Sequence, residues 1–238
     1  MAKTILHKAA TRGHADHGWL NSHHTFSFAN YYHSERMQFG ALRVLNDDIV
    51  AGGRGFDAHP HDNMEIISIP LEGALEHKDN LGNTVITKAG EIQVMSTGTG
   101  VFHSEYNANS DIPAHFLQIW LFPNKLNVAP RYDQVTIETG RPNTLQQLIS
   151  PDQNGEGTWL YQDAWFHMGS FDKGGAATYD VKKQGNGVYF FVIKGKFTIN
   201  GQELDSRDGY GVEDVSSFNI TSLEDGARLL MMEVPLIR

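Results

Sequence analysis

The feature that most constrains the fold of this chain is a succession of short apolar runs separated by turn residues. Runs rich in β-branched and aromatic residues recur at residues 41–45, 64–71, 91–95, 116–122, 188–193 and 227–234. Between them, Gly82-Asn83, Asn200-Gly201 and Asp208-Gly209 are sites at which tight turns are favoured. Long stretches of helical periodicity are scarce. The pattern predicts an all-β chain built as sandwiches or barrels of antiparallel strands.

A weak internal repeat divides the chain into two similar halves. Residues 66–73 resemble residues 189–195, and residues 115–120 resemble residues 228–233, in their apolar pattern. Such self-similarity indicates two domains of one kind. We expect a first domain at residues 1–134, a linker at residues 135–151 with a short helix near residues 145–148, and a second domain at residues 152–238.

The composition narrows the classes of function. The formal net charge is -9 and no run of basic residues is present, which argues against direct nucleic-acid binding because phosphate contacts need clustered Lys and Arg. The chain has no cysteine, so disulfides and thiolate zinc sites are excluded. It shows neither a signal-peptide pattern nor an apolar run of membrane-spanning length. We expect a monomeric cytoplasmic protein with a small-molecule substrate or a protein partner.

The placement of histidines locates the candidate chemistry. Of 12 histidines, 11 lie at or before position 115, and only His167 lies in the second half. His59 and His61 are two residues apart, as are His103 and Glu105, and residues with this spacing on a strand point to the same side. On two facing strands they would offer three nitrogens and one oxygen to a single ion. A six-coordinate ion bound in this way keeps open positions, which dioxygen or a substrate oxygen requires.

Two segments resemble the signature motifs of the cupin superfamily. The first motif, a glycine, five residues, His-x-His and a later Glu, fits residues 53–65, and the second, which ends in a His followed after three residues by Asn, fits residues 90–107. Ser96 stands where the second motif has proline, and four residues instead of two separate Gly98 from His103. Glu65 is the acid of the first motif, so Glu65 and Glu105 compete for the fourth ligand position. If it is not a ligand, Glu65 either accepts the N–H of a ligand imidazole or pairs with an Arg at the rim of the barrel.

A closer resemblance is to the pirin family, and in particular to its bacterial quercetin 2,3-dioxygenases. It rests on residues 12–20 (RGHADHGWL), 24–32 (HTFSFANYY), 42–48, 59–65 and 95–105. The resemblance implies a bicupin, in which two antiparallel β-barrel domains of the jelly-roll type follow each other and only the first holds a metal. By position it assigns His59, His61, His103 and Glu105 as ligands and excludes Glu65.

This resemblance implies a metal-dependent dioxygenase that cleaves the heterocyclic ring of a flavonol such as quercetin and releases carbon monoxide. The ion would bind the deprotonated 3-hydroxyl oxygen of the flavonol, and Glu105 would be the catalytic base for that hydroxyl. Fe(II) is the first expectation, and manganese, cobalt, nickel, copper or zinc would suit the same ligands. Phe56 and Phe102, which are close to the ligands in sequence, are the expected substrate wall.

Two alternatives compete with this hypothesis. Some pirins are described as partners of transcription factors or metabolic enzymes, and iron would then serve a regulator as a redox sensor. Another cupin chemistry on a small acid would need Arg43 or Arg54 near the metal. The histidines and aromatic residues at positions 14–32 are interpreted mainly as packing, and Asp47 and Asp48 as part of a turn.

Overall fold

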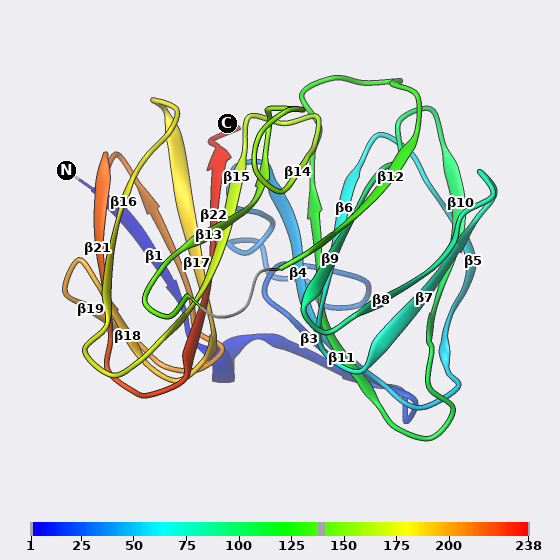
Figure 1. Ribbon diagram of the computed structural model, residues 1–238, viewed down its shortest axis with the longest axis horizontal. Helices are drawn as coiled ribbons and strands as arrows, with labels where there is room; N and C mark the ends of the chain where they lie inside the picture. The colour runs from blue at the N-terminus through cyan, green and yellow to red at the C-terminus, as the bar shows by residue number, and fades with distance from the viewer. Residues whose placement is uncertain (1, 138–140, 238) are drawn as a thin grey trace.

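The computed structural model describes residues 2–137 and 141–237, and it confirms an all-β chain (Figure 1). The strands of the first half are β1 (Lys3–His7), β2 (Gly13–Asp16), β3 (Leu20–His24), β4 (Leu42–Val50), β5 (Gly55–His61), β6 (Glu65–Glu72), β7 (Ala74–Asp79), β8 (Thr84–Lys88), β9 (Glu91–Ser96), β10 (Val101–Asn107), β11 (Ala114–Leu121) and β12 (Arg131–Thr136). Those of the second half are β13 (Gln146–Ser150), β14 (Thr158–Trp159), β15 (Trp165–Phe171), β16 (Ala176–Asp180), β17 (Asn186–Lys194), β18 (Phe197–Ile199), β19 (Gln202–Leu204), β20 (Gly209–Glu213), β21 (Ser217–Ser222) and β22 (Ala227–Pro235). A 3-10 helix, Ala9–Thr11, follows β1. In these two ranges no helix has the length and hydropathy that crossing a bilayer requires.

Each half is a sandwich of one large and one small sheet, largely antiparallel. In the first half the seven-stranded sheet β12-β9-β6-β11-β4-β3-β2 faces the four-stranded sheet β5-β10-β7-β8. In the second half the corresponding sheets are β1-β20-β17-β22-β15-β13-β14 and β16-β21-β18-β19. The two large sheets meet at the centre of the molecule, and the two small sheets lie outside (Figure 1). This repeated double-sheet jelly roll confirms the predicted bicupin architecture.

The main apolar core lies between the two large sheets. Leu117 and Ile119 of β11 belong to one buried cluster with Phe191, Leu230 and Met232 of the second half. The alternate residues of these strands point into the sandwich interiors, so both faces of each large sheet are covered. This explains why residues 116–122 and 227–234 are nearly continuous apolar runs instead of alternating ones.

The two sandwich interiors are filled differently. The interior of the second half contains a cluster of large aromatic side chains that includes Phe171, Phe190, Phe197 and Phe218. In the first half, strands of the large sheet contribute buried polar side chains, namely Ser68, Gln93 and Gln118. The polar interior of the first half is the place where the predicted ligands lie.

Two local features differ from the predictions. Residues 146–150 form strand β13 and no helix, because Leu148 and Ile149 are buried in the central core and the strand pairs with β15. Asp47 and Asp48 lie within β4 and not in a turn.

The structure does not test the predicted domain boundaries. Strand β1 pairs with β20 of the second sandwich, and residues 138–140 of the predicted linker lie outside the described residues. The domain boundaries at 134 and 152 therefore stay predictions.

Candidate metal centre

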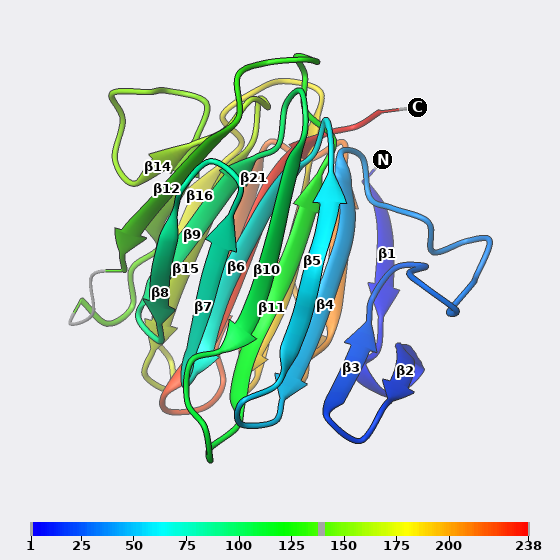
Figure 2. The same cartoon turned by 90° about the vertical axis from the view of Figure 1, so that its right-hand side faces the viewer.

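Strands β5 and β10 lie side by side (Figure 2). Their pairing brings three of the predicted ligands together. His59 lies opposite His103, and the register then shifts so that Glu105 lies opposite Phe56. This β-bulge places one extra residue on β5, which reverses its alternation and lets both His59 and Phe56 face the cavity. One ring nitrogen from each of His59, His61 and His103 lies within 4.8 Å of the other two.

The protonation of the three imidazoles suits metal binding. His59 Nδ1 lies 2.7 Å from the carbonyl oxygen of Asp57, which can only accept, so Nδ1 carries the proton and Nε2 is free in the neutral ring. Burial, helped by the neighbouring imidazoles, lowers the pKa of His61 to about 4 and that of His103 to about 3. His103 Nε2 is buried and has no hydrogen-bond partner in residues 2–137 and 141–237. An unpaired, unprotonated nitrogen beside two further imidazoles fits a divalent ion of the first transition row.

Glu105 projects from β10 across the interior toward the large sheet. Gln118 Nε2 donates to its Oε2 at 2.6 Å, and Gln93 Nε2 donates to its Oε1 at 3.1 Å. Ser68 Oγ lies 3.0 Å from the same Oε1. These hydrogen bonds fix the orientation of the carboxylate and stabilise its negative charge.

The possible ligands form two overlapping groups. The first contains His59, His61 and His103, and the second contains His77, His103 and Glu105, with all ligand atoms of a group within 4.8 Å of one another. His103 belongs to both. The structure thus brings the four predicted ligands to one region, and their joint coordination of one ion stays a prediction.

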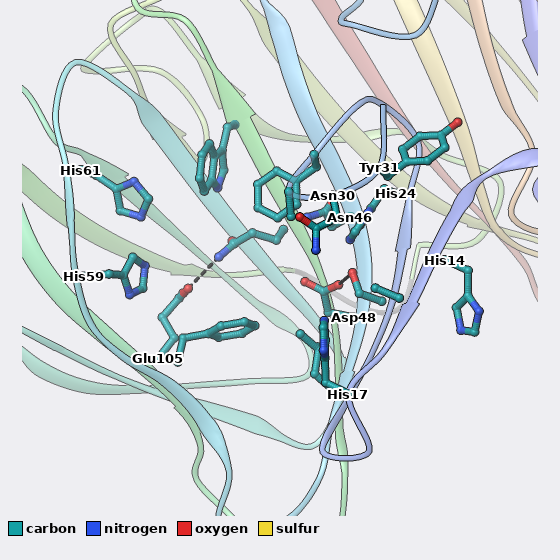
Figure 3. Close-up of a pocket in the computed structure, with 18 residues that line it drawn as sticks. His14, His17, His24, Asn30, Tyr31, Asn46, Asp48, His59, His61 and Glu105 are labelled. Atoms are coloured by element: carbon teal, nitrogen blue, oxygen red, sulfur yellow. Dashed lines mark hydrogen bonds between the residues drawn. The ribbon is translucent and has the colours of Figure 1, made fainter. Parts of the chain in front are cut away.

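Three of the four predicted ligands, His59, His61 and Glu105, line a cavity of about 490 Å³, a volume usual for small-molecule sites. The walls are mostly apolar or aromatic, and they include Leu20, Phe28, Tyr31, Phe56 and Trp120. His59, His61 and Glu105 lie on one side of the cavity, and His24, Asn46 and Asp48 lie across from them (Figure 3). Among the described residues that line the cavity, none is Lys or Arg.

Strands β3 and β4 make the far end of the cavity. Ser22 lies opposite Asp48 and His24 lies opposite Asn46 in their antiparallel pairing, and all four residues line the cavity. Ser22 donates a hydrogen bond to Asp48. Burial raises the pKa of Asp48 to about 7, with a further contribution from nearby carboxylates, although the Ser22 bond acts to lower it. This carboxyl can therefore be protonated near neutral pH.

The two predicted substrate contacts have different surroundings. Phe56 lines the cavity, and its contact with a substrate stays a prediction. Phe102 is 56% exposed and does not line the cavity, so the structure does not bring it to the expected substrate wall. It follows directly before His103 on β10, and adjacent residues of a strand point to opposite faces. Arg43 and Arg54, which a small acid would need, do not line the cavity either.

Glu65 lies apart from the candidate centre. It is buried and accepts a hydrogen bond from Ser96 Oγ at 2.7 Å. Burial raises its pKa. Within the described ranges, no ligand imidazole donates a hydrogen bond to it. Arg131 acts on its charge and favours the ionised form, but no Arg among the described residues makes a hydrogen bond to it.

The sequence interpretation misses the contribution of the N-terminal segment. Its residues His14, His17, His24, Phe28 and Tyr31 line the cavity instead of serving only as packing. The alternation of a strand could have identified some of these lining residues. Residues 20, 22 and 24 of β3 share one face and are buried, while residues 21 and 23 on the other face are less buried. A second signal is a single polar residue inside an apolar run, as at positions 68, 93 and 118. A buried polar side chain needs a hydrogen-bond partner, so such residues indicate a polar site in the interior.

Comparisons with known proteins identify the family of the chain. The chain matches the family described as Pirin over residues 6–121 and that described as Quercetinase C-terminal cupin domain over residues 147–234. A quercetin 2,3-dioxygenase of Escherichia coli (strain K12) is 40% identical over 230 residues, which are 97% of this chain and 98% of that protein. A pirin-like protein of Caulobacter vibrioides is 40% identical over 223 residues, 92% of this chain and 94% of that protein. The crystal structure of a bacterial pirin from Escherichia coli in complex with nickel(II) has a TM-score of 0.93 at 40% identity and covers 99% of this chain and 100% of that one.

Proposed function

The chain belongs to the pirin family, and we propose that it is a metal-dependent dioxygenase that opens the heterocyclic ring of a flavonol with release of carbon monoxide. The observation that carries the proposal is a cavity with aromatic walls that is lined by the carboxylate of Glu105 and by two of three clustered imidazoles, those of His59 and His61. The name quercetin 2,3-dioxygenase of a relative that matches nearly the whole chain supports it.

We assign His59, His61, His103 and Glu105 as the ligands of one divalent ion. The unpaired Nε2 of His103 and the Nδ1–H of His59 support this assignment, because each leaves an Nε2 lone pair available. Fe(II) is our first choice for the ion, and Mn, Co, Ni, Cu or Zn suits the same donors; the related bacterial pirin was crystallised with nickel(II). When bound, the ion supplies Lewis acidity and open coordination positions to the reaction.

The walls of the cavity favour a flat and uncharged substrate. Phe28, Phe56 and Trp120 offer aromatic surface on which a fused ring system can pack. A small organic acid would instead need a cation opposite its carboxylate, and the described lining residues include no Lys or Arg. The cavity therefore supports a polyphenol over the acid substrates of other cupin enzymes.

The far end of the cavity favours a substrate with ring hydroxyl groups. Asn46 Oδ1 and His24 Nδ1 are buried and have no hydrogen-bond partner within the described ranges, and a buried group left unpaired costs about 1–3 kcal/mol. A hydroxyl group on the ring remote from the metal would donate to Asn46 or Asp48 and offset part of that cost. Flavonols carry such hydroxyl groups.

Glu105 is the proposed base for the 3-hydroxyl group of the flavonol. Gln118 and Gln93 hold its carboxylate at the metal end of the cavity, where it can take the hydroxyl proton on an oxygen. Both atoms of dioxygen then enter the products and one ring carbon leaves as carbon monoxide. The reaction balances without an external reductant.

Oxygen consumption with quercetin tests this proposal. Protein freed of metal and reconstituted anaerobically with each candidate ion should consume oxygen and release carbon monoxide in proportion to the flavonol lost. His103→Ala and Glu105→Ala should lower metal content and turnover together. Phe102→Ala is the control, because its side chain lies outside the cavity. Stoichiometric metal at these ligands without oxygen uptake for any ion would contradict the proposal.

A redox-sensing regulator is the second candidate function, and one surface feature favours it. Phe102 and Leu81 are exposed apolar side chains beside the sheet that carries the centre. Asn80 connects them, because its Oδ1 accepts from the backbone N–H of Phe102 at 3.1 Å. Hydrogen exchange at residues 80–81 and 102 should differ between the ferrous and ferric protein if this surface reports the state of the metal. Identical exchange would remove this candidate.

A further inference from the structure

A buried pair of side chains lies behind His103, on the strand next to it. In the antiparallel pairing of β7 with β10, Asp79 lies opposite His103 and His77 lies opposite Glu105. The side chains of His77 and Asp79 are inaccessible to solvent. The ring of His77 packs on Tyr132, with ring centroids 4.8 Å apart. The ligand assignment above uses neither His77 nor Asp79.

Asp79 is built into the structure as a charged acceptor. Its Oδ1 accepts the backbone N–H groups of Leu81 and Asn83, each at 3.0 Å, and its Oδ2 accepts from Asn83 Nδ2 at 2.7 Å. Burial by itself raises the pKa of Asp79, but the hydrogen bonds from Asn83 and His77 outweigh it and lower the pKa. A carboxylate in this state has no proton to donate.

The position of the proton on each ring follows from this carboxylate. His77 Nε2 lies 2.9 Å from Asp79 Oδ2, so His77 carries its proton on Nε2 and presents a lone pair at Nδ1. His77 Nδ1 lies 3.3 Å from His103 Nδ1, and a hydrogen bond between two ring nitrogens needs one proton. That proton belongs to His103 Nδ1, which leaves the lone pair of His103 on the buried and unpaired Nε2.

We infer that Asp79 and His77 are positioning residues that fix the Nδ1–H tautomer of His103 and so aim its Nε2 lone pair at the cluster with His59 and His61. The inference rests on the proposed function in taking His103 as a metal ligand. The carbonyl of Asp57 imposes the same tautomer on His59. Partners of this kind orient ligand imidazoles and change metal affinity by about 10–100-fold.

The tautomers are read directly by ¹⁵N NMR of histidine-labelled protein without metal. We expect His103 to be protonated on Nδ1 and unprotonated on Nε2, and His77 to show the opposite pattern. A proton on His103 Nε2 would overturn the inference. This readout needs neither metal nor substrate, so it stands or fails separately from the dioxygenase proposal.

Asp79→Asn is the sharpest variant, because it keeps the shape of the side chain. The remaining oxygen of the new amide would go on accepting the two backbone N–H groups, and the amide NH₂ would replace Oδ2 and donate to His77 Nε2. The Asn83 side-chain amide, which donates to Oδ2 in the wild type, would turn over and accept from the new NH₂ through its Oδ1. The proton of His77 would then move to Nδ1, and that of His103 to Nε2. We expect both NMR patterns to invert and the affinity for Ni(II) to fall by about 10–100-fold.

Asp79, His77 and His103 form a hydrogen-bonded chain, here called the relay. Asp62→Asn is the matched control, because it removes a carboxylate beside His61 that is exposed and does not belong to the relay. It should keep the tautomers and bind Ni(II) within about threefold of the wild type. Thermal unfolding of both variants shows whether they are folded. If folded Asp79→Asn keeps wild-type tautomers, or binds Ni(II) as tightly as Asp62→Asn, the relay does not position His103.

Discussion

Asp48 is a carboxyl group whose surroundings differ from those of a surface residue. It is buried on the wall of the cavity, and Ser22 donates to it. Because burial raises its pKa to about 7, a substantial fraction of the side chain is protonated at neutral pH. Asp48 can therefore accept from a ring hydroxyl of the substrate or donate to a ring oxygen.

We expect Asp48→Asn to stabilise the protein at neutral and alkaline pH. The folded-state pKa of Asp48 lies above its ordinary value of 3.8, so the folded state holds this proton longer and the free energy of unfolding falls as the pH rises from about 4 to about 7. In the variant, residue 48 does not titrate, so the free energy of unfolding does not fall in this way. The difference amounts to about 1.4 kcal/mol for each unit by which the pKa of Asp48 is raised on folding. Urea unfolding of both proteins across this pH range measures the difference. A difference that does not change with pH would contradict the assigned environment.

Alternation along a strand decides which site residues were predictable. His59, His61, His103 and Glu105 could be grouped from the sequence, because a two-residue spacing places side chains on one face of any strand. The same rule places Phe102 on the opposite face from His103, and its assignment to the substrate wall neglects that rule. Phe56 reaches the cavity only because a bulge reverses the alternation of β5, and no local sequence signal marks the bulge.

The turn between β9 and β10 determines how the strand that carries His103 begins. Gly98 in this turn has a φ of 45°, and its carbonyl accepts from the backbone N–H of Asn63 at 2.9 Å. A β-carbon on Gly98 would lie 2.0 Å from the carbonyl oxygen of Val128. The position therefore requires glycine both for its backbone angle and for the close approach of another segment.

Gly98→Ala should destabilise the protein and weaken metal binding together. Left-handed backbone strain costs about 1–3 kcal/mol, and the contact with Val128 forces a further displacement at the start of β10. Gly201→Ala is the control, because Gly201 of the second half also has positive φ but no atom lies within 4 Å of its β-carbon position. Chemical denaturation and a Ni(II) titration compare the two variants. Equal losses for both would show that the approach of Val128 is unimportant.

The partners of each strand and the register of their pairing could not be predicted from the sequence. The six apolar runs coincide with six of the fourteen strands of the two large sheets, namely β4, β6, β9, β11, β17 and β22. The relay through His77 depends on the register of β7 with β10, which the runs do not reveal. The positions of His77 and His103 in the sequence reveal nothing about this register by themselves. Strand β13 was mistaken for a helix because its leucines and glutamines are good helix formers, while burial between the two sheets selects the extended form.

At the scale of the molecule, the two halves are joined by a shared core and by one buried carboxylate. Asp47 accepts from Arg12 Nη1 at 3.0 Å, from His115 Nε2 at 2.7 Å and from Arg207 Nη1 of the second half at 3.1 Å. Burial acts to raise the pKa of Asp47, but the bond from His115 and the two guanidinium groups outweigh it and lower the pKa to about 2. Asp47 lies on the face of β4 opposite to Asp48, so the two neighbours have opposite roles.

Asp47→Asn should destabilise the whole molecule by about 3–5 kcal/mol, because it leaves the buried guanidinium of Arg12 and the partly buried one of Arg207 without their counter-ion. The folded-state pKa is lowered, so the contribution of Asp47 is present above its ordinary value of 3.8 and is lost as the pH falls toward 2. The deficit of the variant should therefore shrink below about pH 4. Because the core is continuous, unfolding should remain one transition by fluorescence and by circular dichroism. A second transition in the variant would show that the halves unfold independently.

We propose that His59, His61, His103 and Glu105 hold one ion beside the aromatic cavity. Anomalous X-ray scattering from crystals of the protein loaded with Fe(II) or Co(II), recorded at the absorption edge of the metal, locates that ion. We expect one peak, bonded to Nε2 of the three histidines and to a carboxylate oxygen of Glu105, with an open side toward Phe56 and Trp120. A peak bonded to His77, or one at another place in the molecule with this site empty, would contradict it.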